Sequence, residues 1–377
     1  MYRPHAFTIK EINMSTVSRT SEIFDAPERA SIAKALLTWF AENKRNLPFR
    51  HADGQGRKDP YAIWISEIMA QQTQIDTLLP YYERFIHQFP DVAALAAAEE
   101  DAVLKTWEGL GYYSRARNLR KAAQTIQSNF NGRFPAAYAD ILSLPGIGPY
   151  TAGAIASIAF DLPVAAVDGN VMRVITRLAD WSIDIAGSDA KKRIGAVVTD
   201  LMPEEAPGDF NEALMELGAL VCTPNAPACL LCPWRDHCRA LAAGRTESLP
   251  VKTKRVRHRI LNVAVGLVTD RRGRLLIEKR PAKGLLAGLW GLPIVEANDN
   301  AAPLDAALSA QLNRPMQGHY LGEAKHVFTH RTWRMRVYRY TVGAFPDGCV
   351  AADRNALHRT YALPTAFSKL LPLLEQS

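Results

Sequence analysis

Two acidic side chains lie in settings that suit them to chemistry. Glu67, in WISEIMAQQT, has apolar neighbours, so we expect its carboxyl on or beside a buried face. Burial raises the pKa of a carboxyl and equips it as a general acid. Asp168, in AAVDGNVMRV, follows an apolar run and precedes a predicted helix, where it could face a developing cation. One protonated and one ionised carboxyl are what cleavage of a glycosidic bond calls for.

Both residues also have simpler interpretations, which the sequence leaves open. Helical spacing by itself favours Glu67 on the solvent-facing stripe of its helix. An aspartate directly before a helix is ordinarily an N-cap.

Four of the five cysteines fall within one short segment, CTPNAPACLLCPWRDHC, at Cys222, Cys229, Cys232 and Cys238. Thiolates grouped in this way surround either Zn²⁺ or a [4Fe–4S] cluster. Zinc sites more often pair two C-x-x-C knuckles, whereas here one C-x-x-C is flanked by single cysteines, so the spacing favours iron–sulfur. Cys349 lies far away and is predicted to be a lone thiol.

The stretch ADILSLPGIGPYTAGAIASIAF, about residues 137–160, predicts a helix, a tight turn and a second helix. Gly146 and Gly148 allow the backbone to turn sharply, and Pro149 suits the first position of a helix. Exposed N–H groups at a helix start bind anions. A free-nucleotide site would require a preceding strand and a G-x-G-x-x-G or G-x-x-x-x-G-K-[ST] pattern, and neither is present. We therefore expect a DNA phosphate at this turn, the alternative being a plain helical corner.

These residues belong to a chain with two textures. Residues 28–220 show helical periodicity with almost no alternation, which predicts an all-α region. Segment 246–258 is basic and contains proline, and we interpret it as a linker. Beyond it, alternating stretches such as WRMRVYRYTV predict strands of a smaller α+β domain.

Composition limits the class of protein. Lys and Arg outnumber Asp and Glu by 45 to 38, which gives a net charge of +7 and favours an anionic partner. No apolar run approaches the roughly 20 residues of a membrane span. Residues 1–26 lack an apolar signal region and are predicted to be a disordered leader. We expect a monomer in a reducing, cytoplasmic compartment of bacterial type, associated with the nucleoid, with no membrane contact and no organelle targeting.

Taken together, the motifs resemble one known family. SEIMAQQT, WEGLGYYSRARNL, LPGIGPYTAGAI, VDGNVMRV, FNEALMELGALVC and the four-cysteine loop resemble the MutY-type adenine DNA glycosylases, which belong to the helix-hairpin-helix superfamily with endonuclease III. The match is dense over residues 28–240. It implies an all-α helix-hairpin-helix glycosylase domain over 27–245 with one [4Fe–4S] cluster in loop 222–238. It also implies a C-terminal α+β Nudix-like domain over 259–377.

The resemblance implies that the protein removes adenine mispaired with 8-oxoguanine or guanine in double-stranded DNA, by flipping the base out of the duplex. Glu67 then matches the acid that protonates adenine N7, and Asp168 matches the carboxylate that stabilises the oxocarbenium-like sugar. Tyr150 and Glu212 match residues that hold the adenine and position the acid. Further substrate-binding positions are matched by Arg45, Leu47 and Asn170. The turn glycines Gly146 and Gly148 would bind the DNA backbone.

A second group of residues matches positions that recognise the oxidised guanine. Gln72, Thr73 and Tyr112 match a wedge into the duplex, whereas Tyr113 fits a core position equally well. KRPAKGLLAGLWGLP and HVFTHRTW resemble the Nudix-like module, without the R-E-x-x-E-E run of a pyrophosphohydrolase. Where the family has F-S-H, this chain has Phe328, Thr329 and His330. Phe49 replaces the family's usual tryptophan.

Two alternatives differ in chemistry. An endonuclease III-like glycosylase and lyase needs an amine to form a Schiff base with the sugar. That relative carries a lysine at the position of Tyr150, and a phenol cannot form the imine. A non-catalytic iron–sulfur DNA-binding protein would release no base. Repair or replication partners are not predictable from these residues.

Overall fold

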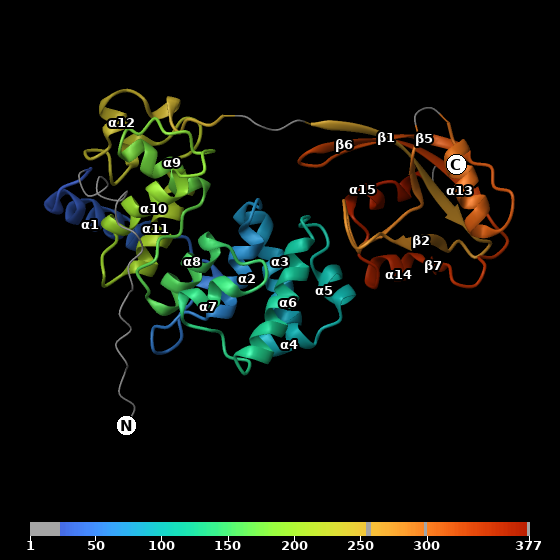
Figure 1. Ribbon diagram of the computed structural model, residues 1–377, viewed down its shortest axis with the longest axis horizontal. Helices are drawn as coiled ribbons and strands as arrows, with labels where there is room; N and C mark the ends of the chain where they lie inside the picture. Colours follow the sequence, from blue (N-terminus) through green and yellow to red (C-terminus); the bar gives the residue numbers. More distant parts are fainter. Residues whose placement is uncertain (1–22, 254–257, 298–299, 375–377) are drawn as a thin grey trace. The chain divides into compact units, whose positions relative to one another are not determined.

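The computed structural model describes residues 23–253, 258–297 and 300–374. Of the predicted leader, residues 1–22 lie outside the described residues, and Ala26 already begins helix α1. The chain forms two compact units (Figure 1). The first comprises the chain up to Ile68 together with Phe134–Thr253, and the second comprises Met69–Arg133 together with the chain from Lys254.

The chain before the predicted linker is helical, as expected from its periodicity. Its α-helices are α1 (Ala26–Asn43), α2 (Pro60–Ala70), α3 (Ile75–Gln88), α4 (Val92–Ala97), α5 (Glu100–Thr106), α6 (Ser114–Asn129), α7 (Tyr138–Ser143), α8 (Pro149–Phe160), α9 (Gly169–Leu178), α10 (Ala190–Leu201), α11 (Pro207–Leu220) and α12 (Arg239–Ala242). Short 3₁₀ turns lie at Pro48–Arg50, Cys229–Leu231 and Thr246–Ser248. No helix of the described residues is long and apolar enough to cross a membrane.

The core of the first unit is made by α1, α9, α10 and α11. Helix α1 starts at the N-cap Asp25, whose side chain accepts from the N–H of Glu28 at 2.8 Å. Helix α8 consists largely of small residues and is buried along most of its length. At Gly153 an added Cβ would lie 2.6 Å from the carbonyl oxygen of Ala165, so close packing requires glycine here.

One break between helices differs from the sequence interpretation. Within residues 28–220, the helical periodicity runs through YAIWISEIMAQQTQIDTLLPYYERF, but the structure interrupts it at residues 71–74, with Gln72 in the left-handed region at φ 62°. The guanidinium of Arg115 donates to the carbonyls of Met69 (3.1 Å) and Gln71 (2.6 Å). A long-range donor of this kind holds carbonyls at a helix end, and local periodicity does not reveal it.

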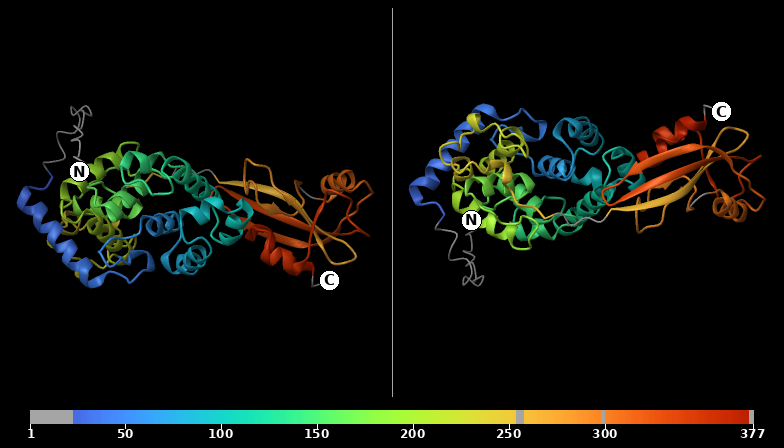
Figure 2. Two further views of the ribbon diagram at one scale, coloured as in Figure 1. Left: turned by 90° about the horizontal axis from the view of Figure 1, so that it is seen from below. Right: turned by 90° about the horizontal axis from the view of Figure 1, so that it is seen from above.

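The C-terminal part is an α+β domain, as predicted. Its strands are β1 (Arg259–Thr269), β2 (Leu275–Lys279), β3 (Trp290–Gly291), β4 (Ile294–Glu296), β5 (His319–Val327), β6 (Arg331–Thr341) and β7 (Val350–Ala352). The main order is β3-β2-β1-β6-β5, with β1 and β6 parallel and β5 and β6 antiparallel. Helix α13 (Ala302–Leu312) packs on one face, and α14 (Arg354–Arg359) and α15 (Thr365–Ser368) pack on the other (Figure 2).

Part of the predicted linker 246–258 is packed against the first unit. Leu249 is 2% exposed, and its carbonyl accepts from Nε of Arg177 at 3.0 Å. The carbonyl of Val251 accepts from the N–H of Ile185. The first half of this segment is therefore fixed on the first unit, and residues 254–257 lie outside the described residues.

Candidate active site

Glu67 lies on α2 with its carboxyl turned into the helical unit, among buried neighbours that include Trp64 and Ile68. Its Oε2 atom is buried and has no hydrogen-bond partner among the described residues. Burial raises the pKa of Glu67 to about 7, a hydrogen bond from Tyr150 opposes this rise, and the charges of Asp168 and Glu212 add to it. A carboxyl in this state still carries a proton near neutral pH, as a general acid requires.

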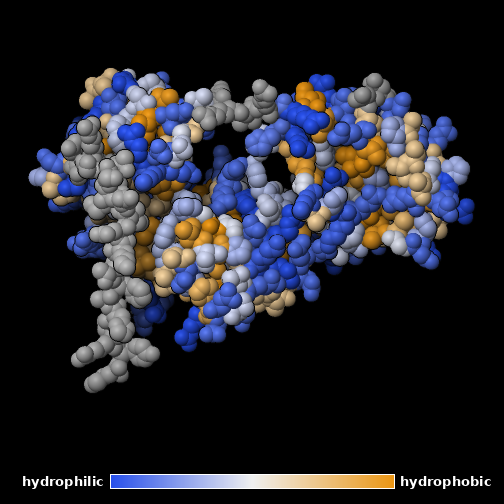
Figure 3. Space-filling view, in the orientation of Figure 1, coloured by the Kyte–Doolittle hydropathy of each residue, from blue (hydrophilic) through white to orange (hydrophobic). Residues whose placement is uncertain are grey.

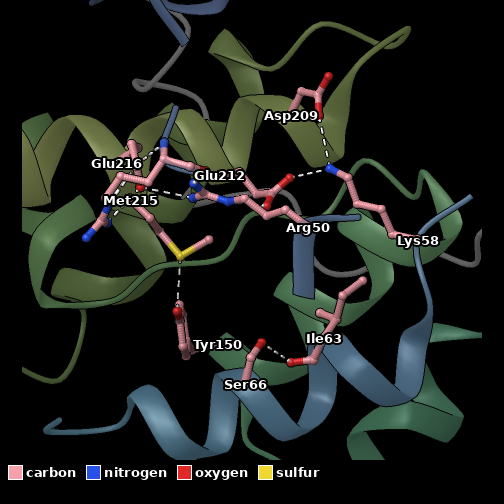
Figure 4. Close-up of polar contacts among 10 residues, drawn as sticks. Arg50, Lys58, Ile63, Ser66, Tyr150, Asp209, Glu212, Met215 and Glu216 are labelled. Carbon is pink, nitrogen blue, oxygen red and sulfur yellow. Dashed lines mark hydrogen bonds and ion pairs between the residues drawn. The ribbon is translucent and has the colours of Figure 1, made fainter. Parts of the chain in front are cut away.

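Tyr150 occupies the first turn of α8, directly after Pro149. Its hydroxyl lies 3.1 Å from the sulfur of Met215 on α11 (Figure 4) and also interacts with the Glu67 carboxyl. Burial raises the pKa of this phenol well above its ordinary value. Tyr150 is therefore a neutral hydrogen-bond donor beside the acid.

Asp168 is the N-cap of α9, so the simpler interpretation of this residue is confirmed. Its carboxylate accepts from the N–H of Val171 at 2.7 Å and from the amide of Asn170 at 3.1 Å. Burial raises the pKa of Asp168, while these hydrogen bonds oppose the rise. Asn170 is itself held by Arg173 at 2.9 Å. The carboxylate thus has a fixed orientation in a largely buried setting.

An ion-pair network borders this site (Figure 4). Glu212 and Glu216, one helical turn apart on α11, are 4% and 1% exposed. Arg50 bridges them, with Nε 2.9 Å from Glu212 and Nη2 3.0 Å from Glu216. Arg45 completes the pairing of Glu216 at 2.8 Å. Lys58, two residues before α2, contacts the other carboxylate oxygen of Glu212.

The network keeps the Glu216 carboxylate charged. Burial alone would raise the pKa of Glu216, but hydrogen bonds from Arg45 and Arg50 outweigh it and lower the pKa to about 2. Burial would likewise lower the pKa of Lys58, but the charges of Glu212 and Asp209 outweigh it and raise the pKa. Its amine contacts Glu212 and lies 3.2 Å from Asp209.

The helix-hairpin-helix is present as predicted, with α7 leading through the turn into α8. Gly146 has φ 80°, a conformation that favours glycine, and Gly148 is the N-cap of α8. Among the described residues no side chain caps the start of α8, and the N-terminus of a helix favours an anion. Leu47, predicted in the substrate pocket, is 3% exposed in the core next to the 3₁₀ turn that carries Phe49.

The residues predicted to recognise oxidised guanine lie in the second unit. Tyr112 is 44% exposed at φ 46°, and its hydroxyl lies 2.5 Å from that of Thr329. Phe328 packs edge-on against Trp333, and His330 is exposed in the turn between β5 and β6. Tyr113 is a core residue. Gln72 and Thr73 occupy the break between α2 and α3.

The four clustered cysteines line one cavity, together with Arg177. Arg177 donates to the carbonyls of Thr223 (2.6 Å) and Pro224 (3.0 Å), and its Nη1 lies 3.5 Å from the sulfur of Cys222. In the described part of the chain, no three His, Cys, Asp or Glu side chains are arranged to hold a single metal ion.

Sequence reasoning missed Arg50, Lys58, Glu216 and Arg177. The i, i+4 spacing of Glu212 and Glu216 places both carboxylates on one face of an apolar helix, which requires cations opposite them. That spacing was a usable signal, although it does not identify the cations.

Comparison with known proteins agrees with this geometry. Residues 65–196 match the HhH-GPD superfamily base excision DNA repair proteins, and residues 264–373 match the NUDIX domain. Adenine DNA glycosylase of Mus musculus is 32% identical over 390 residues, covering 89% of this chain and 76% of its own. Adenine DNA glycosylase of Homo sapiens is 33% identical over 407 residues, covering 92% and 74%.

Among solved structures, a thermostable thymine-DNA glycosylase covers 58% of this chain and all of its own, with TM-score 0.50 and 28% identity. The comparisons confirm the expected fold class, a helical glycosylase domain followed by a Nudix-like domain. Similarity to the mouse and human proteins extends through both domains. The chain therefore belongs to the adenine DNA glycosylases of the HhH-GPD superfamily.

Proposed function

We propose that this protein hydrolyses the N-glycosidic bond of adenine mispaired with 8-oxoguanine or guanine in double-stranded DNA, without cutting the strand. The observation that carries the proposal is a glutamate whose desolvated carboxyl has a pKa of about 7, beside a half-buried phenol and a fixed aspartate. Membership of the adenine DNA glycosylases supports the choice of base.

In the proposed reaction the adenine leaves its stack and enters the pocket, at a cost of about a few kcal/mol. Glu67 donates its proton to N7, so that the bond between C1′ and N9 breaks with its electron pair passing to the base. Asp168 stabilises the positive charge that develops on the sugar. Water then adds to C1′, and the proton that it loses passes to the Glu67 carboxylate, which restores the acid.

Two features support hydrolysis over lyase chemistry. Tyr150 supplies a phenol next to Glu67, where a lyase would need an amine. Lys58, the lysine of the ion-pair network, has its amine paired with Glu212 and Asp209. A protonated amine in two ion pairs is a poor nucleophile.

We assign the remaining predicted residues to recognition. Arg45, Leu47, Asn170 and Glu212 would shape the adenine pocket, and the turn at Gly146 and Gly148 would hold a backbone phosphate. Gln72, Thr73 and Tyr112, with Phe328, Thr329 and His330, would contact the opposite base. The hydroxyl contact between Tyr112 and Thr329 supports their acting as one group.

We further propose that Cys222, Cys229, Cys232 and Cys238 hold one [4Fe–4S] cluster. Their shared cavity and the neighbouring Arg177 support this assignment, because a nearby cation stabilises negatively charged sulfur. When bound, the cluster would fix the loop that follows α11. We place the protein in the cytoplasm at the DNA.

One assay tests the function. The protein is given duplexes with adenine opposite 8-oxoguanine and with thymine glycol opposite adenine, and base release and strand nicking are scored separately. We expect adenine release without β-elimination. Release only from the thymine glycol duplex, or none, would overturn the proposal. Asp168→Asn should abolish release and leave lesion binding intact, since asparagine can still cap α9.

A further inference from the structure

One face of the C-terminal sheet carries a row of polar and basic side chains. Pairing between strands aligns Asn262 of β1, Arg334 of β6 and Lys325 of β5. Two residues further along β6 and β5, Arg336 and Glu323 face the same side, because alternate residues of a strand share a face. These five residues line a groove of about 510 Å³.

The same face is covered elsewhere. Helix α13 packs on Ala264, Tyr338 and Tyr340, further along β1 and β6. Arg334 and Lys325 remain exposed and make no ion pair with any described side chain. The basic row is therefore the solvent-exposed part of this sheet face, whereas the other part is buried under α13.

The charges of this face are not balanced internally. Arg336 pairs with Glu323 at 3.3 Å, and both side chains are well exposed. Arg334 and Lys325 lie directly opposite one another on antiparallel strands, an arrangement of like charges that destabilises a sheet. A bound anion would relieve this repulsion.

The row is continuous with the turn that holds Thr329 and His330. Between them the face carries two exposed apolar residues, Ile260 and Val327, and Figure 3 shows an apolar spot beside hydrophilic surface where β1 begins. At about 3.3 Å per residue, Lys325 is roughly 13 Å along the chain from Thr329. That span corresponds to about four base-pair steps of a duplex.

We propose that the face formed by Asn262, Lys325, Arg334 and Arg336 binds the phosphate backbone of duplex DNA, a few nucleotides from the base contacted by the β5–β6 turn. The inference rests on the proposed function, which makes duplex DNA the substrate. Phosphates match this face because guanidinium groups bind them in a bidentate manner, and the cations of Arg334 and Lys325 lie side by side on neighbouring strands.

The test is the salt dependence of DNA binding by the full-length protein. The variant Lys325→Gln with Arg334→Gln removes two cations and leaves a neutral polar side chain at each position. We expect the slope of log Kobs against log salt concentration to fall by about 2, at roughly 0.9 per lost phosphate contact. The loss should be equal for an undamaged duplex and for an adenine:8-oxoguanine duplex, because phosphates carry no sequence information.

The matched control is Arg271→Gln with Arg272→Gln, which removes two charges from the exposed β1–β2 turn at the other end of β1. Its slope should equal that of the unaltered protein. A slope for the groove variant equal to that of the control would overturn the proposal, as would a loss confined to the lesion duplex. An acidic protein partner for this face would give that unchanged slope.

A second variant decides the matter if the double variant fails to fold. Glu323→Gln removes the anion paired with Arg336, so it should tighten binding and steepen the slope; unchanged binding contradicts the proposal. Adenine release by the unaltered protein is measured in parallel. Normal release with unchanged slopes refutes this site alone, whereas absent release with altered slopes refutes the proposed function alone.

Discussion

Glu67 on α2 and Glu216 on α11 are glutamates with buried carboxyl oxygens in the same helical unit, yet their pKa values are shifted in opposite directions. The region around Glu67 offers a phenol and two further carboxyl groups, and the pKa rises to about 7. The region around Glu216 offers two guanidinium groups, and the pKa falls to about 2. Both carboxyls are desolvated, so the difference comes from the partners.

This contrast separates two uses of a buried acid. Glu216 is satisfied by Arg45 and Arg50 and joins α11 to the segment before α2. Glu67 has an oxygen with no hydrogen-bond partner among the described residues, a cost that a folded protein keeps where function requires it. The arginines of the network pair with Glu216 on α11, and the pKa of Glu67 stays raised.

The largest expected effect is on the rate of adenine release and comes from replacing Glu67. Glu67→Gln should lower the rate of adenine release by about 10²–10⁴-fold, because the general acid is lost while size and polarity are kept. Single-turnover base release measures the rate. Binding to the mispaired duplex should persist; near-normal release would exclude Glu67 as the acid.

Replacing Glu216, the glutamate with a structural role, should lower the stability of the fold. Glu216→Ala leaves the Arg50 charge buried without one of its partners, and we expect the free energy of unfolding to fall by about 3–5 kcal/mol. Denaturant unfolding measures it. Asp53→Ala, which breaks the exposed pair with Arg57, is the control and should change little. An equal effect of both variants would refute the contrast between buried and exposed pairs.

The two carboxyls should also give opposite pH dependences of stability. Because the folded pKa of Glu67 lies above 4.5, the native state binds more protons between pH 4.5 and about 7, and stability falls as pH rises through this window. The cost is about 3 kcal/mol. Unfolding of Glu67→Gln from pH 4.5 to 8 should lack this decline. The Glu216 contribution is present above pH 4.5 and is lost as pH falls towards 2. A decline retained in Glu67→Gln would assign it to another group.

The smallest effect concerns Tyr150. Its hydrogen bond lowers the pKa of Glu67, so Tyr150→Phe should raise that pKa further. The alkaline limb of the rate profile, where the acid loses its proton, should then move up by about one pH unit. Rates of base release across pH measure the shift. A limb that stays in place would show that the phenol acts on the substrate rather than on the acid.

Much of this fold could be predicted from local pattern. The N-cap role of Asp168, the turn at Gly146 and the strand at WRMRVYRYTV follow from short-range rules of capping, backbone freedom and alternation. The break between α2 and α3 could not, because Arg115 closes it from more than 40 residues away.

The sequence by itself determined which residue types were available: an acid among apolar neighbours, a phenol in place of an amine, and four grouped cysteines. Only the tertiary structure decided their states. Arg50 and Lys58 are 162 and 154 positions along the chain from Glu212, the glutamate that both contact. These cations pair with the glutamates of α11, whereas the neighbour of Glu67 is a phenol. A pKa depends on burial and on charges within a few ångströms, and distance in space is fixed by packing rather than by order along the chain.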